Sequence, residues 1–159
     1  MKIKNIIDED FSNYKVCSMF IGFPRCTFKC EHDCGCKGMC QNAALTLSPD
    51  IDIDVQTVVN RYVSNPLSQA IVCGGLEPFD SLEDLVCLVT SVRSVGIEDP
   101  IIIYTGYNKN ELELPLTKLR KFNNIIIKYG RFVPNQEKHF DAVLGVYLAS
   151  SNQYAERLS

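Results

Sequence analysis

The cysteines of this chain gather near its N-terminus. Of its eight cysteines, five lie in one short stretch: Cys26, Cys30, Cys34, Cys36 and Cys40. Thiolates repel one another unless a cation or a cross-link holds them together. In a reducing compartment clustered cysteines are more often ligands or redox groups than disulfides. The sequence therefore predicts a metal or iron–sulfur centre in a cysteine loop over residues 22–42.

The residue types in this loop leave two kinds of centre open. Any four of the five thiolates could close a tetrahedral zinc site, with one to spare. Alternatively, three of them could hold an iron–sulfur cluster. His32 also lies in the loop, where we expect it to face solvent.

Length and composition predict one domain over residues 1–159. The 46% hydrophobic composition is enough for an ordinary core. With a net charge of -3 and scattered lysines and arginines, we expect neither a nucleic acid nor a membrane as partner. The first ten residues resemble neither a secretory signal nor a membrane span, so we expect a cytoplasmic protein.

Short apolar runs alternate with amphipathic segments along the rest of the chain. Strands are predicted at residues 16–21, 69–73, 100–104 and 124–128. Helices are predicted at 55–63, 81–94 and 110–122. Asp54 and Ser81 are expected to cap the first two helices, and Pro115 to delay the third. Cys17, Cys73 and Cys87 lie in apolar contexts and are expected to be buried.

Strands that alternate with helices indicate an α/β fold with parallel strands and crossover helices. The loops that follow such strands meet at one edge of the sheet. Three segments of interest follow strands here: the cysteine loop, residues 74–78 (GGLEP) and residues 104–107 (YTGY). We therefore expect them to lie close together.

The pattern Cys26-x3-Cys30 followed by Cys40-Gln41-Asn42 resembles the iron–sulfur loop of radical S-adenosylmethionine (SAM) enzymes, usually CxxxCxxC. The resemblance implies that three thiolates hold a [4Fe-4S] cluster whose fourth iron is open to the methionyl part of SAM. Nine residues rather than two separate Cys30 from Cys40. Cys34 and Cys36, which lie between them, stay open as alternative third ligands.

Residues 74–78 resemble the Gly-Gly-Glu-Pro segment of the same family, where the backbone approaches the cofactor and polar groups hold its ammonium. Glycine permits such an approach. Leu76 is inserted before Glu77 here. The other interpretation is a strand-to-helix turn that simply needs glycine.

Three later segments resemble the activating component of the anaerobic ribonucleoside-triphosphate reductase, a small radical SAM protein family. They are residues 104–107 (YTGY), 129–133 (YGRFV) and 150–153 (SSNQ). Tyr129 replaces an acid of the family pattern and Ala149 a glycine. The resemblance runs in order from about Val16 to Gln153. Without it, the tyrosines would be packing residues at a strand end and residues 150–153 a polar turn.

The resemblance implies a fold, a reaction and partners. The fold is an incomplete, TIM-like barrel of parallel strands with crossover helices. The reaction is reductive cleavage of SAM to a 5′-deoxyadenosyl radical, which installs a glycyl radical on the reductase large subunit. An electron donor such as flavodoxin or ferredoxin is implied as well. The alternatives are a radical SAM enzyme acting on another small molecule or peptide, and a non-enzymatic zinc-binding module.

The resemblance also assigns residues, while no catalytic residue is expected beyond the cluster ligands. The implied cluster ligands are Cys26, Cys30 and Cys40. The implied SAM-binding residues are Asn42, Gly74, Gly75, Glu77, Thr105, Ser151 and Asn152.

Overall fold

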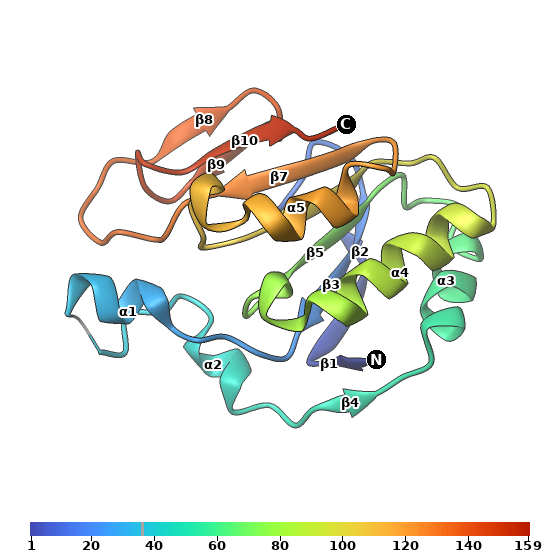
Figure 1. The fold of residues 1–159 in the computed structure, drawn as a ribbon, viewed down its shortest axis with the longest axis horizontal. Coiled ribbons are helices and arrows are strands. Elements are labelled where there is room, and N and C mark those ends of the chain that lie inside the picture. The colour runs from blue at the N-terminus through green and yellow to red at the C-terminus, as the bar shows by residue number, and fades with distance from the viewer. Residues whose placement is uncertain (36) are drawn as a thin grey trace.

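The computed structural model describes residues 1–35 and 37–159, and its main element is a six-stranded sheet (Figure 1). In spatial order the strands are β10 (Tyr154–Arg157), β7 (Ile125–Tyr129), β6 (Ile101–Tyr104), β5 (Ile71–Gly75), β3 (Ser18–Phe23) and β2 (Asn5–Asp10). Two small antiparallel pairs are β1 (Lys2–Ile3) with β4 (Ile51–Asp52), and β8 (His139–Asp141) with β9 (Val146–Leu148).

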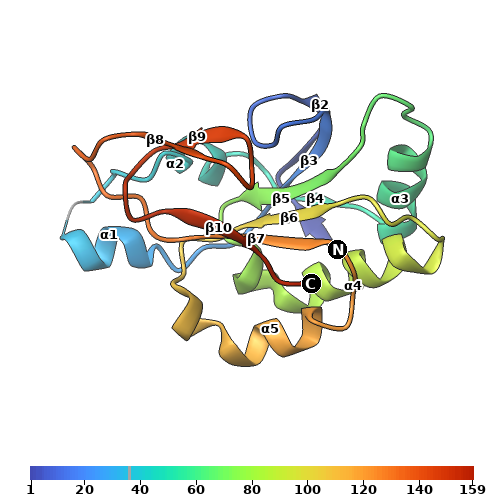
Figure 2. The ribbon, with the colours of Figure 1, turned by 90° about the horizontal axis from the view of Figure 1, so that it is seen from above.

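The four central strands of the sheet are parallel, and the two outer strands are antiparallel to their neighbours. Helices α3 (Val55–Val63), α4 (Leu82–Ser94) and α5 (Glu113–Leu119) connect successive parallel strands. Figure 2 shows α4 and α5 on one side of the sheet and the β8–β9 hairpin on the other, and α3 shares an apolar cluster with α4. The described elements form a mixed α/β fold with parallel and antiparallel strands. Among the described strands β2 and β10 do not pair with each other, and the partial barrel stays a prediction.

Apolar side chains on both faces of the central strands explain why these strands are buried. Ile101 and Ile103 pack among the helices, whereas Ile102 contributes to a second cluster under the β8–β9 hairpin. Successive side chains of a strand point to opposite faces, so a run of isoleucines fills both layers. This is why the isoleucine runs could be recognised as central strands from the sequence.

The cysteine loop contains the short helix α1 (Lys29–Cys34), and a second short helix, α2 (Ala43–Thr46), follows the loop directly. Short 3-10 helices, η1 (Pro78–Ser81) and η2 (Lys109–Glu111), precede α4 and α5. The prediction of helix 55–63 is confirmed residue for residue, and the four predicted strands are found with shifts of one or two residues. The predicted helix 110–122 is instead split into η2 and α5, with Pro115 in the first turn of α5, where no internal amide partner is needed.

Asp54 and Ser81 occupy the N-cap positions of α3 and α4 as predicted, but without the expected capping bond. Neither Asp54 nor Ser81 caps its helix with a side-chain hydrogen bond, and the buried Ser81 hydroxyl finds no partner among the described residues. The reason at Ser81 is that the helical path begins earlier, in η1. There Glu77 is the capping residue, because its carboxylate accepts a hydrogen bond from the Phe79 amide.

The isolated cysteines differ from one another in burial. Cys73 is fully buried as predicted, and Cys17 is partly buried. Cys87 is exposed, so its predicted burial is wrong: it lies on the solvent side of α4, away from Leu85 and Leu88. His32 is exposed as predicted. Within residues 1–35 and 37–159, every helix is too short or too polar to cross a lipid bilayer.

Candidate functional site

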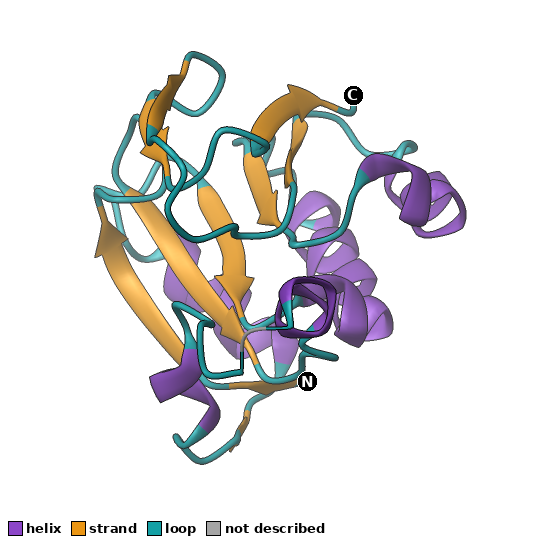
Figure 3. Cartoon of the chain, turned by 90° about the vertical axis from the view of Figure 1, so that its left-hand side faces the viewer, coloured by secondary structure: helices purple, strands orange, loops and turns teal. Residues whose placement is uncertain are grey.

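A cavity of about 370 Å³ lies where the parallel strands end. Figure 3 views the molecule from this end, with α1 and the β8–β9 hairpin toward the reader. Most of the residues implied by the resemblance line this one cavity: Cys26, Cys30, Cys40, Asn42, Gly74, Gly75, Glu77 and Thr105. The fold therefore brings together segments that are far apart in the sequence.

Glu77 ties two of the strand-end loops to each other. Its carboxylate accepts hydrogen bonds from the Gly106 amide at 2.8 Å, the Phe79 amide at 3.2 Å and the Thr105 hydroxyl. Its own amide donates to the Arg25 carbonyl at 2.7 Å, which joins it to the cysteine loop. Burial raises the pKa of Glu77 to about 7, although these hydrogen bonds act in the opposite direction.

The diglycine turn approaches strand β3 too closely for a side chain. Gly75 has a φ of 85°, and a β-carbon there would lie 2.7 Å from the Gly22 α-carbon and 2.9 Å from the Phe23 amide nitrogen. The Gly75 carbonyl accepts a 2.7 Å hydrogen bond from the Asn42 side-chain amide. Asn42 thus fastens the end of the cysteine loop to the diglycine turn.

We expect Gly75→Ala to lower the free energy of unfolding by about 3 kcal/mol, since it adds backbone strain and a clash with β3. The matched control is Gly96→Ala, because Gly96 has a similar φ of 82° but open space around it. That variant should lose only about 1 kcal/mol. Urea unfolding measures both, and equal losses would contradict the steric argument.

Cys26 and Cys30 are half-buried thiols on either side of a strained turn. Phe28, at the start of α1, has a left-handed backbone with a φ of 53°, and its amide donates to the Cys26 sulfur at 3.2 Å. Burial raises the pKa of Cys26 to about 12, and negative neighbours, Cys30 among them, add to the shift. Burial also raises the pKa of Cys30, with a further contribution from Cys40. These thiols lie close enough to repel as thiolates, and a bound cation would reverse that effect.

The structure places the remaining cysteines of the loop differently. Cys34 ends α1, where its thiol donates to the Glu31 carbonyl at 3.6 Å, and it does not line the cavity. The Cys40 amide donates to the Glu31 carboxylate at 3.2 Å, and Cys40 does line the cavity. Cys36, an alternative third ligand, lies outside the described residues.

The two C-terminal residues implied to bind SAM do not line the cavity. The Ser151 amide and hydroxyl both donate to the Gln136 side-chain oxygen, at 3.0 and 2.8 Å. The Asn152 side chain donates to the Arg131 carbonyl at 2.9 Å. Their side chains therefore hold the loop that follows β7.

Comparison with models of protein families gives one decisive match. Residues 15–154 match the model described as "4Fe-4S single cluster domain". The chain belongs to this family. No curated protein and no solved structure matches it. Membership in the 4Fe-4S single cluster domain family supports an iron–sulfur centre over the zinc alternative, and it spans the cysteine loop, the diglycine turn and the later strand ends.

The donor set suits the cluster of a 4Fe-4S single cluster domain. In the described part of the chain, no three Cys, His, Asp or Glu side chains are arranged to hold a single metal ion. Cys26, Cys30 and Cys40 all line one cavity. A cluster binds each thiolate through a different iron, so three thiols around one cavity can serve as its ligands without meeting at a single ion. Exclusion of water by the surrounding residues would then influence the reduction potential of the cluster.

Sequence reasoning missed one residue of this 4Fe-4S single cluster domain. Lys128, at the end of β7, lines the cavity and is only 7% exposed. Its ammonium donates to the Gly130 carbonyl at 3.0 Å. Burial lowers its pKa to about 8, while the charge of Glu77 acts in the opposite direction. A lysine that ends a run of three isoleucines was the signal in the sequence, because a buried strand rarely keeps a charge without a use for it.

Proposed function

We propose that this protein cleaves SAM reductively at a [4Fe-4S] cluster held by Cys26, Cys30 and Cys40. The product, a 5′-deoxyadenosyl radical, would install a glycyl radical on the large subunit of an anaerobic ribonucleotide reductase. One observation carries the proposal: a single cavity joins the three thiols to the diglycine turn and Glu77. The 4Fe-4S family match supports the cluster, and the sequence resemblance supports SAM and the partner.

The charged residues of the cavity suit a zwitterionic ligand. Lys128 offers an ammonium and Glu77 a carboxylate, and both are almost fully buried. No ion pair joins the two within residues 1–35 and 37–159. Glu77 accepts hydrogen bonds from the Phe79 and Gly106 amides, and Lys128 donates to the Gly130 carbonyl, so the protein holds both groups in place at the cavity. The methionyl part of SAM carries one carboxylate and one ammonium. Opposite charges in a desolvated cavity would bind and orient it more strongly than they would in water.

The chain's other contribution is to hold this cavity in shape. Asn42 fixes the cysteine loop to Gly75, and Glu77 connects the loops after β5 and β6. Held by Cys26, Cys30 and Cys40 and reduced by an external electron donor, the cluster would supply one electron to the sulfonium of SAM. The bond between the sulfur and the 5′ carbon would then break, giving methionine and the 5′-deoxyadenosyl radical. Such a radical takes hydrogen from any nearby group, so a rigid cavity that excludes stray groups favours transfer to one target.

Anaerobic reconstitution with iron and sulfide tests the proposal. We expect the reduced protein to convert SAM to methionine and 5′-deoxyadenosine. With a reductase large subunit deuterated at its glycines, deuterium should appear in the 5′-deoxyadenosine, and a glycyl radical signal should appear in electron paramagnetic resonance spectra. Flavodoxin or ferredoxin should replace the chemical reductant.

The outcomes separate the parts of the proposal. Cleavage of SAM without transfer to the large subunit would contradict the partner but retain the radical chemistry, and labelled peptides or small molecules would then be the substrates to test. A colourless protein that is purified with zinc and does not take up iron would contradict the cluster itself.

A further inference from the structure

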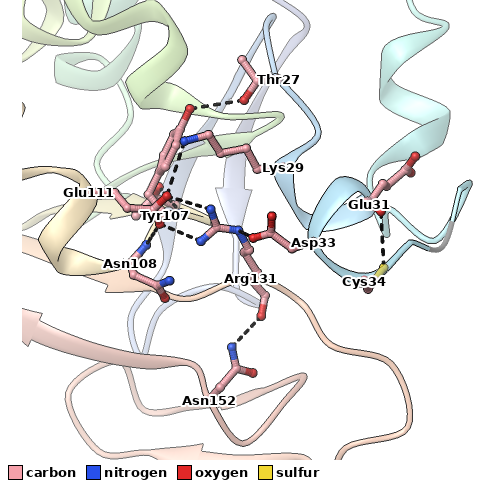
Figure 4. A network of polar contacts seen from close by, with 12 residues as sticks. Thr27, Lys29, Glu31, Asp33, Cys34, Tyr107, Asn108, Glu111, Arg131 and Asn152 are labelled. Atoms are coloured by element: carbon pink, nitrogen blue, oxygen red, sulfur yellow. Dashed lines mark hydrogen bonds and ion pairs between the residues drawn. The ribbon is translucent and has the colours of Figure 1, made fainter.

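Arg131 is the centre of a polar network that reaches the cysteine loop (Figure 4). It follows β7 in the chain, and its side chain is only 12% exposed. Two of its nitrogens donate to the two oxygens of Glu111, at 2.6 and 2.8 Å. Its Nε lies 2.6 Å from Asp33 of α1, in an ion pair that is not aligned as a hydrogen bond. One guanidinium thus connects α1 to the loop before α5.

A second set of contacts joins the same two regions. Lys29, next to Cys30, lies 3.4 Å from Glu111 and 4.7 Å from the centre of the Tyr107 ring. The Tyr107 hydroxyl donates to Asp80 at 2.6 Å, and Asp80 accepts the Thr27 amide at 2.7 Å. Thr27 follows Cys26 directly. Cys26 and Cys30, the first two proposed ligands, therefore each have a sequence neighbour that this network holds: Thr27 and Lys29.

Helix α1 depends on polar contacts for its position, and besides those of Lys29 and Asp33 its Glu31 carboxylate accepts a hydrogen bond from the Cys40 amide. It is six residues long, none of its residues is buried, and its first turn begins at the left-handed Phe28. Helices this short are unstable in water unless tertiary contacts support them. Since no described residue of α1 is buried, ionic and hydrogen-bonded contacts contribute much of that support.

The ion pairs of Arg131 can hold α1 in place. The fork of a guanidinium matches a carboxylate with two parallel hydrogen bonds, which makes the pair stronger and more directional than a lysine pair. The pKa of Glu111 is lowered to about 2, chiefly by its hydrogen bonds to Arg131. Asn152 fixes the Arg131 backbone from the other side. Arg131 is thus itself well positioned.

We propose that Arg131 is a positioning residue that holds α1, and with it Cys30, against the rim of the cavity. The inference deepens the proposed function and rests on it for the role of Cys30 as a ligand. Asp33 and Glu111 are the groups through which Arg131 acts. Arg131 would make no contact with the cluster.

Hydrogen exchange of the metal-free protein tests the contact without any cluster. In Arg131→Gln the amides of α1 should exchange about tenfold faster, because their helix loses its support. Arg131→Lys should restore less than half of the protection, since an ammonium cannot contact both carboxylates as the fork does. Arg61→Gln is the matched control: Arg61 makes a similar two-oxygen pair with Asp8, on β2 and outside the cavity. It should leave α1 unchanged.

The reconstituted protein gives the second measurement. A chelator should remove iron from Arg131→Gln about tenfold faster than from wild type, and the change that SAM causes in the electron paramagnetic resonance spectrum should weaken. Asp33→Asn should show part of the same effect, and combining it with Arg131→Gln should add less than the sum of the two.

The outcomes test the positioning role of Arg131 separately from the cleavage of SAM. Unchanged exchange in α1 of Arg131→Gln, or additive effects in the double variant, would overturn the inference even if the wild type cleaves SAM. Faster exchange in α1, together with a wild-type protein that does not cleave SAM, would support the positioning role and contradict the proposed function.

Discussion

We expect Cys40→Ala to lose the visible absorption of the iron–sulfur cluster and the cleavage of SAM, whereas Cys34→Ala keeps both. Cys40 lines the cavity with Cys26 and Cys30, while Cys34 does not. Loss of one of three thiolate ligands should lower the affinity for iron more than about 100-fold, beyond the effect of changing a residue that only supports a ligand. Iron and sulfide analysis after anaerobic reconstitution measures the difference.

The control for this prediction is Cys87→Ala, which removes an exposed thiol on α4. It should leave iron content and cleavage at wild-type values. Cys36→Ala is also expected to keep the cluster. The reverse pattern, with iron lost in Cys34→Ala and kept in Cys40→Ala, would assign the third ligand to Cys34 and contradict the arrangement described above.

Lys128→Met should weaken the binding of SAM by about 10- to 100-fold without lowering the stability of the protein. Lys128 is the buried cation of the cavity wall, so its loss removes one charge-assisted contact with a carboxylate ligand. The apolar methionine side chain fills nearly the same space and needs no hydration, so the free energy of unfolding should stay the same or rise. Calorimetric titration and urea unfolding test the two halves of the prediction.

The pH dependence of stability gives a further check on Lys128. Its pKa is lowered from 10.5 to about 8 in the folded protein. Between these values the unfolded chain binds more protons at this residue, so the contribution of Lys128 to the free energy of unfolding should rise as the pH increases from 8 toward 10.5. The buried thiols of Cys26 and Cys73, whose pKa is raised, contribute in the opposite direction, so the rise is measured as the difference between wild type and variant. Lys128→Met should lack this rise, and the exposed Lys121→Met should keep it. Equal weakening of SAM binding by Lys121→Met would contradict a specific role for Lys128.

The central strands and the gathering of the site could be predicted because each depends on a local pattern. Ile101–Ile103 and Ile125–Ile127 are apolar at every position, as strands buried on both faces require. Since parallel strands end at the same edge, the cysteine loop, the diglycine turn and Thr105 were expected together, and one cavity contains all three.

What could not be predicted depends on contacts between distant segments. The side chain of Glu77, rather than that of Ser81, makes the capping hydrogen bond, because a 3-10 turn precedes the helix. Arg131 and Asp33 form an ion pair although they are almost a hundred residues apart in the sequence, and no periodic pattern connects them. Ser151 and Asn152 came from a motif, and a motif does not state which way a side chain points. The structure directs Asn152 to the Arg131 backbone.

The two outer strands of the described sheet, β2 and β10, are not paired with each other, and this bears on the size of the proposed substrate. Because β2 and β10 are not hydrogen-bonded to each other, the described sheet encloses no channel through which a substrate would have to be threaded. A folded macromolecule could present a single hairpin or loop broadside, and withdraw it after reaction without losing its own structure. Access would then depend on how well two surfaces match rather than on the width of an entrance.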